Sequence, residues 1–219
     1  MAFPDRTVAG REVAARLGHL AGQASVIVLG LPRGGVPVAY EVARALGAPL
    51  DVLLARKLGV PQQPELAMGA VAAGGVRVLH QAVIDARGST PDVVDAAAAR
   101  EGAEATRRER SYRAGRPPLD VAGRTVVVVD DGLATGSTMR AAIAALRALR
   151  AGRIVVAVPV GARETCRELA AVADEVVCVE APADFHAVGQ FYDDFSPTTD
   201  DEIRALLGPP GPKENEHGE

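Results

Sequence analysis

The 219-residue chain is poor in several features that mark whole classes of protein. It has no tryptophan, four phenylalanines, three tyrosines and two cysteines. Cys166 and Cys178 lack the spacing of metal ligands, so we expect buried structural thiols. No apolar run approaches the roughly 20 residues that cross a bilayer, and the N-terminal residues lack an apolar signal core, which predicts a cytoplasmic protein without a membrane partner. A formal net charge of −4 gives no basic footprint for nucleic acid.

The composition that remains is that of a globular protein. Hydrophobic residues make up 48% of the chain, and its length is sufficient for one well-cored domain. We therefore predict a single domain over residues 1–208. The last residues, 209–219, are polar and rich in proline and glycine, which predicts a disordered tail.

The central stretch of the sequence is a short strand followed by two acids and a loop. Four consecutive valines, Val126–Val129, predict a strand buried on both faces, as in a parallel sheet. Asp130 and Asp131 follow, and a loop rich in glycine and hydroxyls leads into a helix predicted over Ser137–Arg150. Ligands of open α/β sheets bind at the carboxyl ends of strands, and a helix N-terminus attracts phosphate. The stretch therefore predicts a site for a phosphorylated, hydroxylated ligand with a metal ion.

Strands and helices alternate on both sides of this stretch, which indicates an α/β fold with a mainly parallel sheet. Thr7 is a candidate N-cap for the first helix, Gly47 ends the second, and Thr199 to Glu202 fits a capping box for the last. The predicted core strands are 25–29, 50–55, 124–129, 154–158 and 175–179, and the predicted helices are 7–20, 36–46, 137–150, 163–172 and 201–207.

Residues from about 60 to 118 interrupt the alternation. Glu65–Ala73 and Val76–His80 flank Gly74-Gly75, which favours a β-hairpin. A long, highly charged helix follows over Pro91–Arg113, with charges of both signs at i,i+4 spacing. This helix is either a solvated arm or cover over the hairpin, or a mobile lid or dimer contact.

A second glycine-rich loop follows the first core strand. It has the sequence Leu31-Pro32-Arg33-Gly34-Gly35, in which the glycines let backbone amides approach an anion and Arg33 can bind it bidentately. The loop does not fit the dinucleotide fingerprint, because it lacks the Gly-x-Gly-x-x-Gly spacing. It does not fit the Walker loop either, because the ending Gly-Lys-Ser/Thr is absent. The two loops together indicate a ligand with charge at both ends.

These residues resemble the phosphoribosyl pyrophosphate (PRPP) signature of the type I phosphoribosyltransferases, in which an apolar strand, two acids and a spacer precede Thr-Gly-x-Thr. The resemblance covers about residues 25–180 in element order. With Arg33-Gly34-Gly35, Arg56 to Pro61 and Ala187 to Gln190, the chain is most similar to a bacterial branch of phosphoribosyltransferase-like proteins. One departure is Gly132, where the family usually carries an apolar residue, although Leu133 is still available to anchor the loop.

The resemblance implies the fold and a set of roles. The fold is a five-stranded, mainly parallel sheet flanked by helices, with the hairpin and long helix as an insertion. A small C-terminal hood, about 181–208, completes it, with the N-terminal segment as a candidate second part. Asp130 and Asp131 would accept hydrogen bonds from the ribose hydroxyls and act in catalysis, and Arg33, Gly34 and Gly35 would bind the diphosphate. The 5-phosphate would lie among Ala134, Thr135, Gly136, Ser137 and Thr138.

Two further assignments stay open between alternatives. Arg56 and Lys57 either bind the diphosphate or form a solvated strand end. Four aromatic residues lie between 184 and 195, and Phe185 is the one best suited to stack on a planar acceptor. The alternative is a small satellite core that fixes the C-terminal helix to the sheet.

The resemblance implies transfer of the phosphoribosyl group from PRPP to a nitrogen acceptor, such as a nucleobase, with release of pyrophosphate. Mg²⁺ would be held mainly by PRPP, with Asp130 and Asp131 as the candidate protein ligands. A PRPP- or nucleotide-sensing protein and a PRPP hydrolase are the alternatives. Members acting on 6-oxopurines usually carry an aspartate where this chain has Ala134, so the acceptor stays open. Members of the family are commonly dimers, so the resemblance is compatible with a homodimer.

Overall fold

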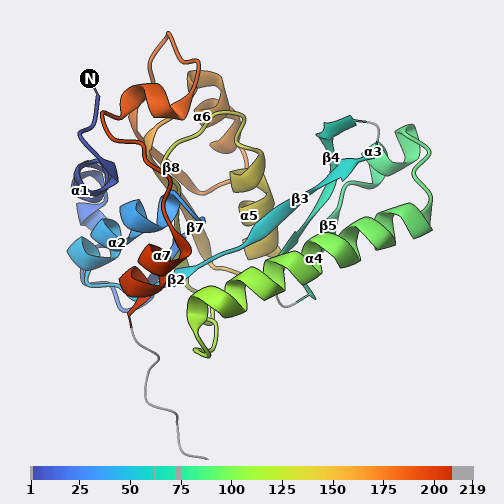
Figure 1. Ribbon diagram of the computed structural model, residues 1–219, viewed down its shortest axis with the longest axis horizontal. Coiled ribbons are helices and arrows are strands. Elements are labelled where there is room, and N and C mark those ends of the chain that lie inside the picture. Colours follow the sequence, from blue (N-terminus) through green and yellow to red (C-terminus); the bar gives the residue numbers. More distant parts are fainter. Residues whose placement is uncertain (1, 62, 73–74, 209–219) are drawn as a thin grey trace, which may run out of the picture.

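The computed structural model describes residues 2–61, 63–72 and 75–208. The predicted tail over 209–219 and part of the predicted Gly74-Gly75 turn lie outside the described residues. The body of the molecule is a five-stranded parallel sheet in the order β2-β1-β6-β7-β8. This confirms the predicted fold class (Figure 1). Its strands are β1 (Val26–Gly30), β2 (Leu50–Val52), β6 (Thr125–Val129), β7 (Arg153–Val160) and β8 (Glu175–Glu180).

Helices cover both faces of this sheet, and β6 shows why its valines are all buried. Val126 and Val128 face one core, which includes Met139 and Leu146 of the following helix. Val127 and Val129 face a second core formed with the first two helices. Successive residues of a strand point to opposite faces, so a strand between two helical layers is apolar throughout. The helices are α1 (Arg6–Arg16) and α2 (Gly35–Leu46) on one face, and α5 (Ser137–Ala148) and α6 (Arg163–Leu169) on the other.

A second sheet projects from the body and forms an arm. It is antiparallel, in the order β3-β4-β5, and its apolar side packs on the long helix α4 (Pro91–Arg113). We call β3, β4, β5, the short helix that follows and the N-terminal half of α4 the arm (Figure 1). The arm elements other than α4 are β3 (Ala55–Val60), β4 (Gln63–Ala72), β5 (Arg77–Leu79) and α3 (Gln81–Ala86).

The C-terminal segment returns across the body. It contains two short helices, η3 (Val188–Phe191) and α7 (Asp200–Leu207), and α7 packs on α2 and on the C-terminal half of α4. Thr199 and Glu202 form the predicted capping box of α7. Phe3 pairs with Tyr192, so the N-terminal segment lies against the hood. None of the described helices is both long enough and apolar enough to cross a membrane.

Three expectations from the sequence are wrong in detail. The cap of α1 is Asp5, whose carboxylate accepts from the Val8 N–H at 2.7 Å, and not Thr7; a one-turn helix, η1 (Gly18–Leu20), follows α1. The strand predicted over 50–55 ends at Val52, and Ala55 begins β3 of the other sheet. Cys166 and Cys178 are free and half-buried rather than buried.

Candidate functional site

Asp130 and Asp131 lie at the carboxyl end of β6, where the sequence places them. The N–H of Asp131 donates to Asp130 Oδ1 at 2.9 Å. The Asp131 carboxylate binds the Arg6 guanidinium through two nitrogens, each at 2.9 Å, and its backbone carbonyl accepts from the Tyr192 hydroxyl at 2.7 Å. The acid pair is thereby fixed by residues from both ends of the chain.

The surroundings of the pair make its ionised form costly. Burial raises the pKa of Asp130 well above its ordinary value, and the neighbouring Asp131 carboxylate raises it further. Burial also raises the pKa of Asp131, while the Arg6 guanidinium opposes that shift. Two half-buried carboxyls with raised pKa values favour a positive charge placed beside them, because a cation stabilises their ionised form.

The second glycine-rich loop packs directly against this acid pair. The Leu31 N–H donates to the Val129 carbonyl at 2.8 Å, and the Pro32–Arg33 peptide bond is cis. A Cβ atom on Gly35 would lie 2.7 Å from the Val129 oxygen, and a Cβ atom on Gly34 would collide with the Asp131 carboxylate. The glycines are therefore required by this close approach, which places the two loops side by side.

The loop that precedes α5 is anchored to the body by Leu133 and Ala134, and it carries the hydroxyls of three residues. Leu133 is buried and bridges to the end of β7, donating to the Val160 carbonyl at 2.9 Å. The Thr165 hydroxyl donates to the Ala134 carbonyl at 2.7 Å. Gly136 has a φ of +68° and is the N-cap residue of α5. The hydroxyls of Thr135 and Ser137 lie 3.1 Å apart, and Thr138 is exposed in the first turn. Hydroxyl groups beside a helix N-terminus are suited to binding an anion.

The structure explains why position 132 is glycine in this chain. A Cβ atom there would meet the Val188 side chain at 2.5 Å. Val188 of the hood thus occupies the space that an apolar side chain at position 132 would fill, so the loop gains its apolar contact from another segment.

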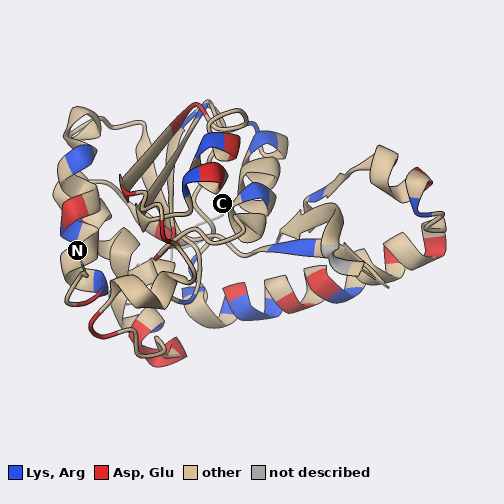
Figure 2. Ribbon diagram, turned by 90° about the horizontal axis from the view of Figure 1, so that it is seen from above, with Lys and Arg blue, Asp and Glu red and all other residues tan. Residues whose placement is uncertain are grey.

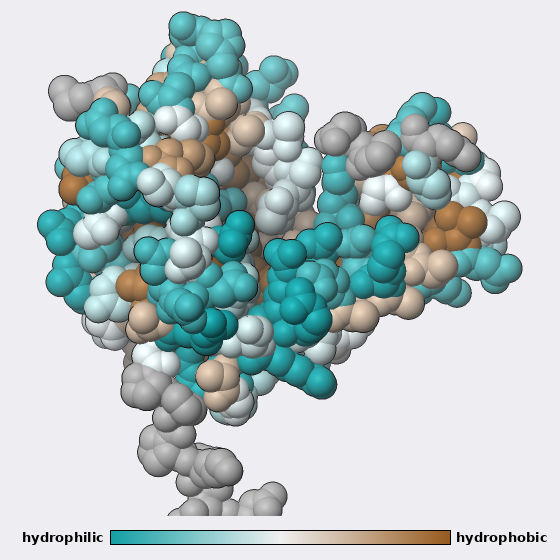
Figure 3. All heavy atoms as spheres, in the orientation of Figure 1, coloured by the Kyte–Doolittle hydropathy of each residue, from teal (hydrophilic) through white to brown (hydrophobic). Residues whose placement is uncertain are grey.

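A cleft of about 340 Å³ connects the two loops with the arm. Pro32 of the second loop and Thr138 of α5 line it, as do Arg56, Lys57 and Arg108. Arg56 and Lys57 belong to β3 and not to the end of β2, so the arm brings them to the site. Figure 3 shows the surface hollowed where the arm joins the body.

Phe185 lies outside the lining of this cleft. Its ring stacks on Phe191, with centroids 5.6 Å apart and planes 16° apart, and both rings pack in the hood cluster with Tyr192. This contact favours the packing alternative for Phe185.

Another cavity, of about 870 Å³, lies beside the C-terminal half of α4. Its lining is mainly apolar, and among its charged residues Arg113 binds both Asp51 and Glu109. This network holds α4 on β2, whereas the smaller cleft contains the residues with anion-binding chemistry.

Sequence reasoning missed Arg6 and Arg108. Arg6 reaches Asp131 from the first helix, and its guanidinium also lies over the Phe195 ring, 4.2 Å from the centroid. Nothing local in the sequence indicates that contact. Arg108 lies in a run of alternating charges, which indicates a helix surface but not which side chain faces a cleft. Within the described part of the chain, no group of three or more His, Cys, Asp or Glu side chains is placed to hold a metal ion.

Comparisons with known proteins show which family the chain belongs to. Residues 6–196 match the family described as the phosphoribosyl transferase domain. Two proteins of Mycobacterium tuberculosis, from strains CDC 1551 and H37Rv, are each named "Putative phosphoribosyl transferase". Each is 51% identical over 205 residues, which is 94% of this chain and 46% of the relative. The chain therefore spans about half the length of the curated relatives it matches.

Two solved structures are similar. TT1426 from Thermus thermophilus is 46% identical, with a TM-score of 0.87 over 94% of this chain and 98% of that one. AQ2163 from Aquifex aeolicus is 10% identical, with a TM-score of 0.51 over 93% of this chain and 84% of that one, and shares the fold alone. With the family match covering most of its length, this chain belongs to the phosphoribosyltransferase family.

Proposed function

We propose that the protein transfers the 5-phosphoribosyl group of PRPP to a nitrogen acceptor, a nucleobase or similar planar heterocycle, with release of pyrophosphate. The observation that carries the proposal is the packing of Gly34 and Gly35 on Asp131 and Asp130. It brings a glycine-rich anion loop, two carboxylates and a helix N-terminus to one edge of the sheet. PRPP has a diphosphate, a ribose diol and a 5-phosphate, in that order.

Each end of PRPP then has its own loop. The backbone N–H groups from Ala134 to Thr138 and the hydroxyls of Thr135 and Ser137 surround the 5-phosphate. The amides of Gly34 and Gly35 and the Arg33 guanidinium bind the diphosphate, with Lys57 and Arg56 at the cleft. Charge-assisted hydrogen bonds of this kind contribute about 1.5–3 kcal/mol each, so a handful gives micromolar binding.

The acid pair acts on the ribose. Asp130 and Asp131 accept hydrogen bonds from the 2- and 3-hydroxyls and place negative charge beside the cation that develops at C1 as the diphosphate leaves. Burial raises the pKa of both carboxyls, so their ionised form is costly and a cation that develops beside them lowers that cost. Catalysis rests on positioning and electrostatics rather than on a protein nucleophile.

The acid pair also fits a magnesium ion shared with the substrate. Mg²⁺ prefers one or two protein carboxylates together with substrate oxygens, and Asp130 and Asp131 are the carboxylates at this edge. When bound, the ion would neutralise diphosphate charge and so favour its departure.

The test is a calorimetric titration with PRPP and Mg²⁺, followed by a pyrophosphate-release assay with a panel of nucleobases. We expect binding, and release only with an acceptor. The double variant Asp130→Asn with Asp131→Asn should fold and lose that release.

Other outcomes identify the alternatives. Tight PRPP binding without turnover of any acceptor would make the protein a PRPP sensor, and release without an acceptor would make it a PRPP hydrolase. Full activity in the double variant would refute the ribose-binding role. If neither PRPP nor a nucleoside monophosphate binds, the site is not a PRPP site.

A further inference from the structure

Helix α4 is fixed over the site by its C-terminal half. Tyr112 is buried, and its hydroxyl donates to Asp200 at 2.9 Å. Arg113 binds Asp51 at 2.9 Å, and both side chains are about nine-tenths buried. Arg108 lies just over one turn before Tyr112, so the body, and not the projecting arm, determines where Arg108 stands.

Arg108 belongs to the lining of two cavities at once. One is the cleft with Lys57 and Thr138. The other is a small polar cavity of about 170 Å³ that also contains Arg33 and Ser111. Arg108 therefore connects the glycine-rich anion loop with the cleft.

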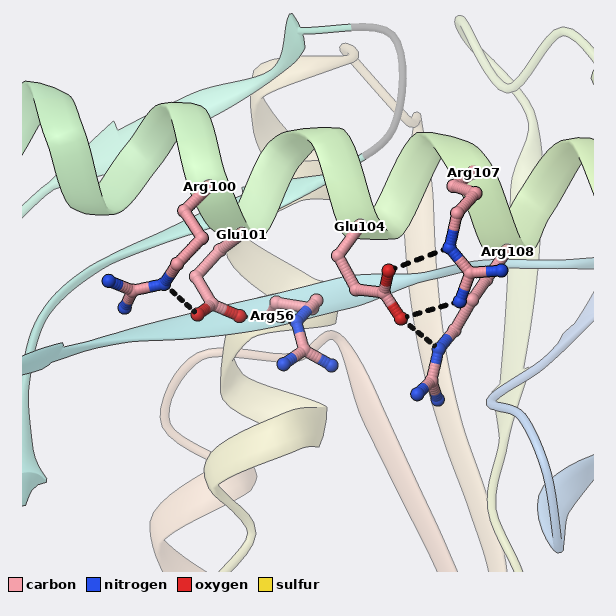
Figure 4. Close-up of polar contacts among 6 residues, drawn as sticks. All are labelled: Arg56, Arg100, Glu101, Glu104, Arg107 and Arg108. Carbon is pink, nitrogen blue, oxygen red and sulfur yellow. Dashed lines mark hydrogen bonds and ion pairs between the residues drawn. The ribbon is translucent and has the colours of Figure 1, made fainter.

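Two glutamates of α4 bind the surrounding arginines (Figure 4). Glu104 accepts from Arg108 Nε at 2.6 Å and from two nitrogens of Arg107 at 2.8 and 2.9 Å. Glu101 accepts from Arg56 at 2.5 Å and from Arg100 at 3.2 Å. Each of the two carboxylates is shared by two guanidinium groups, so these six side chains together carry a net positive charge, although α4 as a whole carries residues of both signs along its length (Figure 2).

A guanidinium binds a carboxylate and a phosphate with the same bidentate geometry, and it binds the more highly charged partner more strongly. We propose that Arg108 is a diphosphate-binding residue and that Glu104 is the carboxylate that the diphosphate displaces from it. The inference rests on the proposed function, because it assumes that PRPP lies between the two loops. It gives α4 a binding role that neither a passive cover nor a dimer contact would have.

Glu104 does not give up Arg108 by becoming protonated at neutral pH. The hydrogen bonds from Arg107 and Arg108 lower the pKa of Glu104 to about 2. The carboxylate is therefore ionised throughout the neutral range, and only another anion can take its place on Arg108.

The experiment compares ligands that carry a diphosphate with one that does not. PRPP, inorganic pyrophosphate and ribose 5-phosphate are titrated by calorimetry into the wild-type protein and the variants Arg108→Ala, Arg108→Lys, Glu104→Gln and Arg100→Ala. Arg100 is the matched control, since it lies on the same helix, also binds a glutamate and lines neither cavity.

Arg108→Ala should weaken PRPP and pyrophosphate about 10- to 100-fold, the effect of losing one charge-assisted hydrogen bond, and change ribose 5-phosphate less than about twofold. Arg108→Lys should recover part of the loss, and Arg100→Ala should match the wild type. Glu104→Gln should bind pyrophosphate more tightly, by about three- to tenfold, because its competitor is neutral.

Equal losses for all three ligands in Arg108→Ala would overturn the inference, as would unchanged pyrophosphate binding or weaker binding in Glu104→Gln. A wild-type protein that binds none of the three ligands would instead refute the proposed function, and the inference with it. The thermal midpoint of each variant shows whether a loss reflects unfolding.

Discussion

The Asp131 carboxylate fills the space in which a Cβ atom of residue 34 would lie. Two loops that are far apart in the sequence thus contact each other directly, and Arg6 binds the same carboxylate. Any side chain at position 34 would have to move Asp131, so the anion loop and the acid pair behave as one unit.

The first prediction is that Gly34→Ala displaces the Asp131 carboxylate and so weakens the binding of PRPP. The added methyl group collides with the Asp131 carboxylate and weakens its ion pair with Arg6. PRPP affinity should fall about tenfold or more, the loss expected when a charge-assisted contact is displaced. Calorimetric titration measures it. Gly18→Ala is the control, because nothing lies within 4 Å of a Cβ atom there. Equal PRPP affinity in the two variants would contradict the prediction.

A second prediction concerns the stability of the acid pair. The folded state raises the pKa of Asp130 by burial, so ionisation of this group at neutral pH opposes folding. Asp130→Asn keeps the oxygen that accepts from Asp131 and removes the charge. At pH 7 its melting temperature should rise by about 2–4 °C, the shift that ~1 kcal/mol gives in a protein of this size, while phosphoribosyl transfer is lost.

The pH dependence of the melting-temperature difference tests whether the pKa of Asp130 is raised in the folded state. The gain should disappear at about pH 3, below the usual pKa of aspartate near 3.9, because Asp130 is then protonated in both the folded and unfolded states. Asp174 is the opposite control: hydrogen bonds from Arg147 and the Ile154 N–H lower its pKa. Asp174→Asn should therefore lower the melting temperature at pH 7, with a difference that shrinks as the pH falls. A loss of stability in Asp130→Asn at pH 7 would argue against a raised pKa.

The sequence predicts the core of the fold and most of the site because these depend on local signals. Val126–Val129 is apolar on both faces, Gly47 takes the left-handed conformation that ends α2, and Thr199 with Glu202 caps α7. The five strands that these patterns locate bring the two loops to one edge without further information.

What sequence reasoning misses depends on contacts between distant segments. The sequence pattern places Arg56 and Lys57 at the end of the second core strand, but β2 has only three residues and the chain turns at Leu53-Leu54 into another sheet. Asp5 and Thr7 are both good cap residues, and only the start of the helix decides between them. The pairing of Arg6 with Asp131 has no signal in either segment.

A third prediction tests the contact between Gly132 and Val188. Gly132→Val places a branched side chain where Val188 already lies, and overpacking of this kind costs about 1–3 kcal/mol. Val188→Ala should make room, so the double variant should be more stable than Gly132→Val alone. Urea unfolding of the four proteins gives the coupling energy. Additive effects would show that the two side chains do not compete for the same space.

A fourth prediction concerns the two cysteines, whose sulfur atoms both lie close to Gly161, next to Leu133 of the loop that precedes α5. A hydrogen bond from Cys178 lowers the pKa of Cys166, and the same interaction, together with burial, raises the pKa of Cys178. Iodoacetamide at pH 7.5, a value chosen about one unit below the usual thiol pKa, should therefore modify Cys166 first. Peptide mass spectrometry over time measures both sites. Cys178→Ala removes the donor and should slow the reaction at Cys166, whereas faster modification of Cys178 in the wild type would contradict the assignment.

The last prediction concerns the ion pair that fixes α4 on the body. Asp51 accepts from Arg113 through both oxygens at 2.9 Å, and also from the N–H groups of Val52 and Leu119. Asp51→Ala leaves these donors unpaired in a buried place, so it should lower the free energy of unfolding by about 3–5 kcal/mol. Asp95→Ala removes an exposed carboxylate of α4 that binds Arg77 and should cost less than about 1 kcal/mol. Urea unfolding compares the two. Similar stability in both variants would show that α4 is held mainly by its apolar contacts.

The same variant also tests the position of Arg108. Because Arg113 holds the turn that carries Arg108, the folded Asp51→Ala variant should bind pyrophosphate more weakly than the wild type.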